Sequence, residues 1–241
     1  MKHELNDLMA SVPPGLEAAD RLCQACVDLL GVDGAAISMV QDGFSFGTYG
    51  ASSEVSRRLD EYQFTFGEGP CLDAAATGGA VLVPDLDSVD ERRWPAFAAA
   101  VVDEGVRAVF ALPIMLTTAC VGALDLFREG PGPLGEQRLA AGWLAAELAA
   151  MPLLDLVAGA TVDQAPEDDG VEQLADLDRV EVYQATGMLV SQLDVDPDEA
   201  LVRLRAHAIA TGQTAKEVAW AILERRLVLE RDPDDRRRKG G

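Results

Sequence analysis

The sequence is poor in the residues that most catalytic sites and basic binding surfaces depend on. Of its 241 residues only 2 are histidine and 4 are cysteine, and 5% are aromatic. So few histidines make a His-based catalytic triad or a multi-histidine metal site hard to assemble. Lys and Arg number 20 against 41 Asp and Glu, and the net charge of −21 excludes a general basic binder of nucleic acid or membrane. Any recognition of a polyanion must therefore be local.

Long hydrophobic runs are also missing. The most apolar stretch, residues 108–126, contains Pro113, Thr117, Thr118 and Asp125, and it is too short and too polar for a membrane span of about 20 apolar residues. The N-terminal residues include acids and no apolar signal-peptide core. Four cysteines without a secretory signal fit a reducing compartment better than a disulfide framework. We therefore expect a soluble cytoplasmic protein with no membrane partner.

Enough apolar side chain is present for a core, since 49% of the residues are hydrophobic. The charge divides the chain, because residues 1–170 hold 27 acids and 9 bases whereas residues 171–241 hold 14 and 11. Residues 158–170 mix small residues, Pro and acids, as linkers do. The predicted organisation is a first domain over 1–158, a linker over 159–170, a second domain over 171–231 and a polar tail over 232–241.

The first domain alternates helix and strand patterns. Apolar residues at helical spacing predict helices over 16–30, 53–59, 71–76, 94–104 and 135–157. Short apolar runs bounded by turn residues predict strands over 35–40, 43–49, 81–83, 108–116 and 120–128. Hairpin connections between these strands favour an antiparallel sheet covered by helices, so we predict an α+β domain.

The second domain is predicted to contain helices only. Apolar residues at helical spacing predict a first helix over 171–193. A second helix begins with Asp196 as N-cap and ends at Gly212 as C-cap. Thr214 and Glu217 form a capping-box pattern for a third helix that ends near Arg231. We predict an all-α module of three helices.

The cysteines offer two kinds of interpretation. Cys23 and Cys26 share one helix face, and we interpret them as core residues because no second Cys-x-x-Cys or His pair completes a zinc site. Cys71 lies in a first helical turn, where the helix dipole lowers the pKa of a thiol. We therefore name Cys71 as a candidate redox thiol, with a core-facing position as the alternative.

The other chemical signatures are weak. Glycines at 130, 132 and 135 match a dinucleotide-binding pattern, but Pro131 and Pro133 remove the backbone donors that a phosphate needs, which favours a plain loop. We expect no catalytic residues, no metal site and no cofactor.

The segment Arg179–Val190 (RVEVYQATGMLV) resembles the first-helix motif of ANTAR domains. That motif has a basic residue, an aliphatic residue and then an Ala-Lys-Gly-x-Leu-Met run, in which Thr186 stands here for the lysine. The likeness continues without gaps through the next two helices, at Ala200, Leu204, Arg205, Ala208, Val218 and Ala219.

Upstream, the segment Phe66–Cys71 (FGEGPC) and the strand residues Val121–Leu124 resemble a GAF domain over most of residues 15–157. ANTAR domains are RNA-binding modules that recognise paired hairpins in leader transcripts as dimers, and GAF domains bind small ligands or mediate dimerisation. The resemblance implies a transcription antitermination regulator and not an enzyme. Its implied partners are RNA, a second copy of the chain and an unidentified small-molecule ligand.

Within the ANTAR-like region we predict RNA contacts from three kinds of group. Arginine and lysine suit phosphates, hydroxyl and amide groups can read exposed base edges, and a mid-helix glycine allows close approach to the backbone. For each arginine the alternative is a solvated helix face, and for the glycine it is tight helix packing. The predicted residues are Arg179, Gln184, Thr186, Gly187, Arg203, Arg205, Thr214 and Lys216.

The sequence leaves two other functions open. One is a thiol-based redox sensor or a GAF-type methionine sulfoxide reductase that uses Cys71 and Cys120. The other is a structural protein whose helical module only dimerises. For the RNA-binding function, we expect the acidic first domain to repel RNA, so that dimerisation must supply a second binding site through effective concentration.

Overall fold

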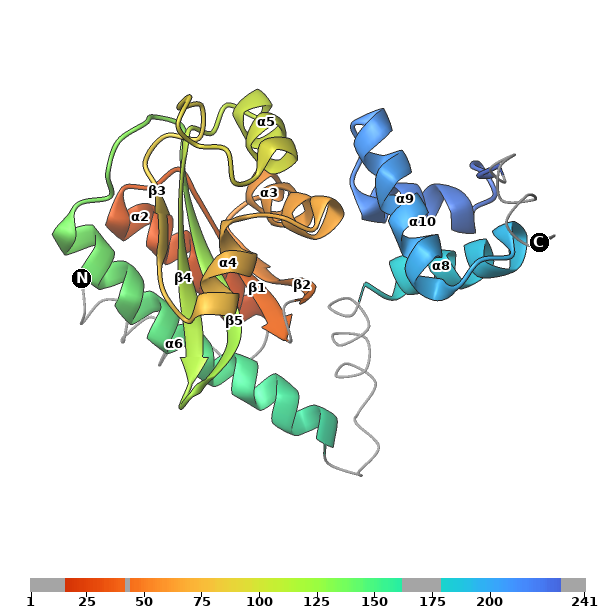
Figure 1. The fold of residues 1–241 in the computed structure, drawn as a ribbon. Helices are drawn as coiled ribbons and strands as arrows, with labels where there is room; N and C mark the ends of the chain where they lie inside the picture. The colour runs from red at the N-terminus through yellow and green to blue at the C-terminus, as the bar shows by residue number, and fades with distance from the viewer. Residues whose placement is uncertain (1–15, 42–43, 162–178, 231–241) are drawn as a thin grey trace. The chain divides into compact units, whose positions relative to one another are not determined.

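The chain forms two compact units that divide between Asp178 and Arg179 (Figure 1). This computed structural model describes residues 16–41, 44–161 and 179–230. Most of the predicted linker over 159–170 and all of the predicted tail over 232–241 lie outside the described residues. The domain boundaries therefore stay predictions.

The first unit is built on an antiparallel sheet in the order β2-β1-β5-β4-β3. The strands are β1 (Gly34–Gln41), β2 (Phe44–Ala51), β3 (Val81–Val83), β4 (Ala108–Leu116) and β5 (Ala119–Arg128). All five agree with the predicted strands to within one residue at each end, except that β2 extends two residues further, to Ala51. The prediction of an antiparallel α+β domain is confirmed.

Helices cover both faces of this sheet (Figure 1). On one face lie α2 (Leu16–Leu30) and α6 (Glu136–Thr161), and on the other lie α3 (Glu54–Phe66) and α4 (Pro70–Thr77). A further helix, α5 (Pro95–Asp103), packs against α3. The prediction that the helix after Ser53 ends at residue 59 is wrong, because α3 continues to Phe66, where Gly67 ends it with a left-handed φ of 66°.

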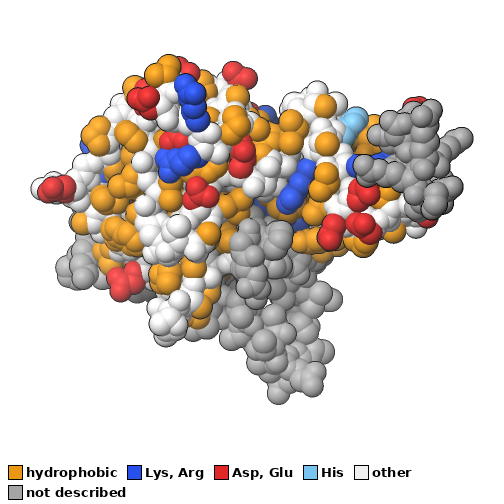
Figure 2. All heavy atoms as spheres, viewed as in Figure 1, with side chains coloured by type: hydrophobic (Ala, Val, Ile, Leu, Met, Phe, Trp, Pro, Cys, Tyr) orange, Lys and Arg blue, Asp and Glu red, His pale blue; other side chains and the backbone are white. Residues whose placement is uncertain are grey.

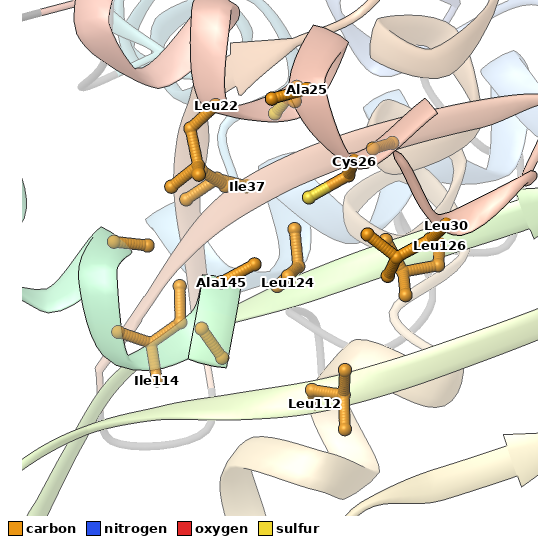
Figure 3. Close-up of a cluster of buried hydrophobic side chains, with 14 of the residues drawn as sticks. Leu22, Ala25, Cys26, Leu30, Ile37, Leu112, Ile114, Leu124, Leu126 and Ala145 are labelled. Carbon is orange, nitrogen blue, oxygen red and sulfur yellow. The ribbon is translucent and has the colours of Figure 1, made fainter. Parts of the chain in front are cut away.

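The larger core lies between the sheet and the helices α2 and α6 (Figure 3). Because side chains alternate along a strand, Ile37, Leu124 and Leu126 point to this face whereas their neighbours point to the other. Figure 3 shows Leu22 of α2 beside Ile37 and Leu30 beside Leu126, in the same core as Cys26, Leu112, Ile114 and Leu124. Cys23 and Cys26 are fully buried in this core, as predicted.

The second unit is a module of three helices, α8 (Val180–Leu193), α9 (Pro197–Thr211) and α10 (Ala215–Leu223). The predicted caps are present, since the Asp196 carboxylate accepts a hydrogen bond from the Glu199 N–H and Thr214 forms a capping box with Glu217. The first helix is described only from Val180, so its predicted start at residue 171 lies outside the described residues.

The predicted end of the third helix near Arg231 is wrong. The helix α10 ends at Leu223, because Arg225 adopts a left-handed φ of 58° and the N–H groups of Arg226 and Leu227 both donate back to the Ala221 carbonyl. The residues after it form no further helical turns within the described part of the chain.

Candidate nucleic-acid interface and buried thiol

The exposed side of α8 carries a face without charge. Its residues fall at helical spacing and are all exposed, and we call them the α8 face: Tyr183, Gln184, Gly187, Met188 and Ser191. The Tyr183 side chain is 49% exposed although it is a large aromatic group. Together with Gln192 and Leu223, residues of this face line a shallow groove. The face therefore offers an aromatic ring, amides and a hydroxyl to a partner.

Gly187 is the most unusual member of this face. A glycine in the middle of a helix destabilises it by about 1 kcal/mol relative to alanine. A Cβ atom built at Gly187 would meet no other atom of the module within 4 Å. Tight packing between the described helices therefore does not explain the glycine.

Two of the predicted arginines lie close together at the beginning of α8. Arg179 precedes the helix in a left-handed conformation with φ 47° and is buried, and Arg205 on α9 is half-buried. Burial lowers the pKa of Arg205, the charge of Arg179 lowers it further, and Tyr183 opposes these effects. These interactions place the Arg205 guanidinium near both Arg179 and Tyr183, at one end of the α8 face.

The remaining predicted residues are engaged within the module itself. The Thr186 hydroxyl is buried and donates to the Val182 carbonyl at 2.7 Å, and buried Thr214 caps α10. Arg203 donates to the Glu199 carboxylate at 2.7 Å, one turn away. The Lys216 ammonium lies 3.9 Å from the Glu181 carboxylate and keeps 41% of its side-chain surface exposed.

No broad basic surface accompanies these residues on the side of the described chain that Figure 2 shows. There, Lys and Arg side chains occur as separate groups between acidic and hydrophobic ones. The net charge of −21 therefore leaves any binding of a polyanion to a few local contacts.

Cys71 lies in a buried polar cluster of the first unit. It is fully buried at the start of α4, packs against Val40 and Ala123, and its backbone N–H donates to the Gln63 side-chain oxygen at 2.8 Å. Gln63 in turn donates from its amide nitrogen to the Asp125 carboxylate. The helix α3 also contributes Asp60, which is fully buried.

Asp60, Gln63 and Asp125 were not predicted as site residues from the sequence. The available signal was Asp125, a carboxylate inside an otherwise apolar strand. In the structure it is fully buried, and its pKa is raised well above the usual range, first by burial and then by the charge of Asp60, while the hydrogen bond from Gln63 opposes the rise. Asp60 gave no signal because it lies on the buried side of a helix whose pattern was interpreted as ending before it.

The reactivity of the cysteines follows from their burial. A thiolate is the nucleophile, and burial raises the pKa of Cys26 to about 12 and that of Cys23 well above its usual value. Cys120 is only partly buried, with a pKa raised mainly by burial, and Cys71 is fully enclosed.

We expect native protein at pH 8 to react with a thiol reagent at Cys120 only, at a rate that rises as the pH passes 9. Mass spectrometry of the labelled peptides tests this, and labelling of Cys71 in the folded protein would show that its helix opens readily.

These two units correspond to known families. A model of the GAF domain matches residues 16–153, more than half of the chain. The chain belongs to the GAF domain family. A model of the ANTAR domain matches residues 173–223, so the GAF domain is followed by an ANTAR domain. None of the described helices combines the length and apolar character that a membrane crossing needs.

Solved structures support the GAF fold. The GAF domain of a phosphoenolpyruvate-protein phosphotransferase from Acinetobacter is 10% identical, with a TM-score of 0.53 over 67% of this chain and 95% of that one. The GAF domain of a phosphoenolpyruvate-protein phosphotransferase from Coxiella burnetii is 15% identical, with a TM-score of 0.52 over 67% of this chain and 95% of that one. At such identities the likeness concerns the fold alone. No curated protein matches this chain.

Proposed function

We propose that this protein is a cytoplasmic regulator of transcription antitermination. Its ANTAR domain binds hairpins in leader transcripts, and its GAF domain controls that binding through dimerisation and through a small ligand. The observation that carries the proposal is the uncharged α8 face, which ends at two neighbouring arginines.

The chemistry of the α8 face suits an RNA loop. Sequence-specific RNA recognition mostly targets loops whose unstacked bases can stack on aromatic rings and hydrogen-bond through their edges. Tyr183 supplies an exposed ring, and Gln184 supplies an amide that can both donate and accept. Gly187 lets the sugar-phosphate backbone or a base approach the helix itself.

Arg179 and Arg205 supply the charge at the end of this face. The Arg205 guanidinium lies near that of Arg179, so this end of the module has a local positive potential that attracts a phosphate. Arginine also presents a planar fork of donors that matches phosphate oxygens. We therefore assign the phosphate contact to the half-buried Arg205, with Lys216 as a further cation. The buried residues Arg179, Thr186 and Thr214 and the ion-paired Arg203 serve the internal structure of the module.

The GAF domain offers a surface for a second copy of the chain. The outer side of α6 exposes Trp143 at 40% and Met151 at 59%. Trp143 and its neighbours on α6, with Pro113 and Met115 of β4, line a groove of about 630 Å³. An exposed apolar helix face of this kind is typical of an interface. We propose that α6 pairs with its counterpart in a homodimer, which brings two ANTAR domains to one RNA.

The reductase or redox-sensor alternative is not favoured. Cys71 is fully buried among Val40 and Ala123, whereas Cys120 lies beside the hairpin between β4 and β5, opposite Met115. Catalytic thiols need partial exposure and a lowered pKa. Burial instead raises the pKa of Cys120.

The α8 face is tested by a Tyr183→Ala variant. We expect it to bind leader hairpin RNAs, transcribed from the genes next to its own, about ten-fold more weakly or worse, because stacking of one base on an aromatic ring is worth about 1–3 kcal/mol. Since Tyr183 is half-exposed, the helical content and melting temperature should stay unchanged. An electrophoretic mobility shift series measures the dissociation constants.

The matched control for this variant is Val202→Ala, which removes an exposed apolar side chain from α9, outside the α8 face. Its RNA affinity should equal that of the parent. An unchanged affinity of the Tyr183→Ala variant would remove the α8 face from the RNA site. If no leader RNA binds the parent protein while dimers form normally, the ANTAR domain is a structural element instead.

A further inference from the structure

The buried cluster around Cys71 contains a set of ligand atoms suited to a metal ion. Carboxylate oxygens of Asp60 and Asp125 and the sulfur of Cys71 all lie within 4.8 Å of one another, and all three residues are fully buried. The three come from α3, α4 and the central strand β5, so the fold and not the local sequence brings them together.

Asp125 places an unsatisfied oxygen in this cluster. Its Oδ2 atom accepts the hydrogen bond from Gln63, but its buried Oδ1 atom has no hydrogen-bond partner among the described residues. A buried carboxylate oxygen without a partner is costly, and each such atom in a native protein calls for an explanation such as an ion. Among the described residues, no Lys or Arg contributes a charge that shifts the pKa of Asp125.

The surrounding residues hold these ligands in place. Gln63 donates to Asp125 and accepts from the backbone N–H of Cys71, so one side chain orients two of the three. Gly69, two residues before Cys71, has φ +151°, and a Cβ atom there would clash with the Gln63 side chain. Asp60 accepts hydrogen bonds from the hydroxyl groups of Ser38 and Thr48. Outer hydrogen bonds of this kind are what orients ligands at metal sites.

We propose that Asp60, Cys71 and Asp125 bind one divalent transition-metal ion, zinc or ferrous iron, inside the GAF domain. The thiolate selects such an ion over magnesium or calcium, which prefer oxygen ligands alone. Zinc–oxygen and zinc–sulfur distances of about 2.0–2.3 Å place tetrahedral ligand atoms about 3.5 Å apart, so the cluster needs to contract by only about 1 Å. The two carboxylates and the thiolate would carry three negative charges, which a divalent ion largely neutralises.

This site goes beyond the RNA-binding function and does not depend on it. It revises the expectation from the sequence that the chain has no metal site, which rested on spacings of cysteine and histidine. A metal ion at this site would also give the GAF domain a ligand of defined chemistry. A sensor of metal availability, or of a gas or an oxidant that binds metals, would use such a ligand.

Cobalt(II) is the probe for the experiment, because a thiolate ligand gives it a charge-transfer absorption band that carboxylates alone do not. The full-length protein is stripped with a chelator and titrated with cobalt(II). We expect one equivalent to bind with a thiolate band, and one equivalent of zinc to displace it and to raise the melting temperature. Magnesium at the same concentration should do neither.

Variants then assign the ligands. Cys71→Ser should abolish the band, and Asp60→Asn and Asp125→Asn should each weaken binding at least ten-fold. Cys120→Ser is the matched control, since it removes a cysteine of the same domain that lies outside the cluster, and its titration should match the parent.

If the parent protein shows no thiolate band when it is titrated with cobalt(II), the proposal is overturned, whatever the variants do. It is also overturned if the band persists in a folded Cys71→Ser protein, because another thiol is then the ligand. If the Cys71→Ser protein does not fold, the two Asp→Asn variants decide: unchanged affinity in both would overturn the proposal.

Discussion

A Trp143→Glu variant is expected to be a folded monomer that binds an RNA with two hairpins at least about a hundred-fold more weakly than the parent. Trp143 lines the apolar groove of α6, is 40% exposed and does not belong to the buried core cluster, so we expect the monomer to fold when it becomes a glutamate. In a dimer, two copies of one carboxylate near a shared apolar seam would be desolvated without a partner. The second hairpin contact then loses its effective concentration, which is worth about 10²–10⁴ in affinity.

Sedimentation velocity measures the oligomeric state of this variant, and mobility shifts compare RNAs with one and two hairpins. The affinity for a single hairpin should stay as in the parent, because the α8 face is untouched. Val89→Glu is the matched control, since Val89 is 79% exposed in the same domain but lies in the loop before α5. A Trp143→Glu protein that remains a dimer would show that α6 is not the interface.

A Gly187→Ala variant is expected to separate stability from function in the ANTAR domain. The new Cβ meets no atom within 4 Å and the helix gains about 1 kcal/mol, so the melting temperature should rise by about 4–8 °C for a unit of this size. The same methyl group would stand between the helix and an RNA that approaches the backbone. We expect the affinity for leader RNA to fall about ten-fold although the protein is more stable. Calorimetry and mobility shifts measure the two effects.

Val202→Ala controls for the gain in helix propensity. It replaces a β-branched residue by alanine on the exposed side of α9, and it should raise the stability slightly while leaving the RNA affinity unchanged. If the Gly187→Ala protein binds RNA as the parent does, the glycine serves no contact with RNA. If it loses dimers instead, the α8 face is an interface between two ANTAR domains.

Elements whose signals are local were predicted well. The first helix over residues 16–30 and the strands of the β4–β5 hairpin agree with the structure to within one residue. The capping box at Thr214 and the C-cap at Gly212 were correct because a cap depends on residues within one turn. The end of α10 was not, because hydrogen bonds from Arg226 and Leu227 back to Ala221 turn the chain there.

Candidate site residues were harder to predict, because the direction in which a side chain points depends on packing. Gln184 and Thr186 are two residues apart, yet the first is exposed and the second is buried against its own helix. Both have the polar groups that RNA recognition uses, and only the helical spacing from the buried residues Val182 and Leu189 distinguishes Thr186 from Gln184. The end of α3 was predicted too early for a related reason, because Asp60 and Gln63 are polar residues that lie on the buried side of this helix.

The sequence by itself determined the two-part organisation, the element types, the helix caps and the likeness to GAF and ANTAR domains, since each depends on neighbouring residues or on a motif in register. Only the tertiary structure decided which polar groups face outward and which meet inside. Asp60, Cys71 and Asp125 are separated by up to 65 residues and lie on three elements. Their proximity results from the pairing of β5 at the centre of the sheet and the packing of α3 and α4 on one face, which no local pattern encodes.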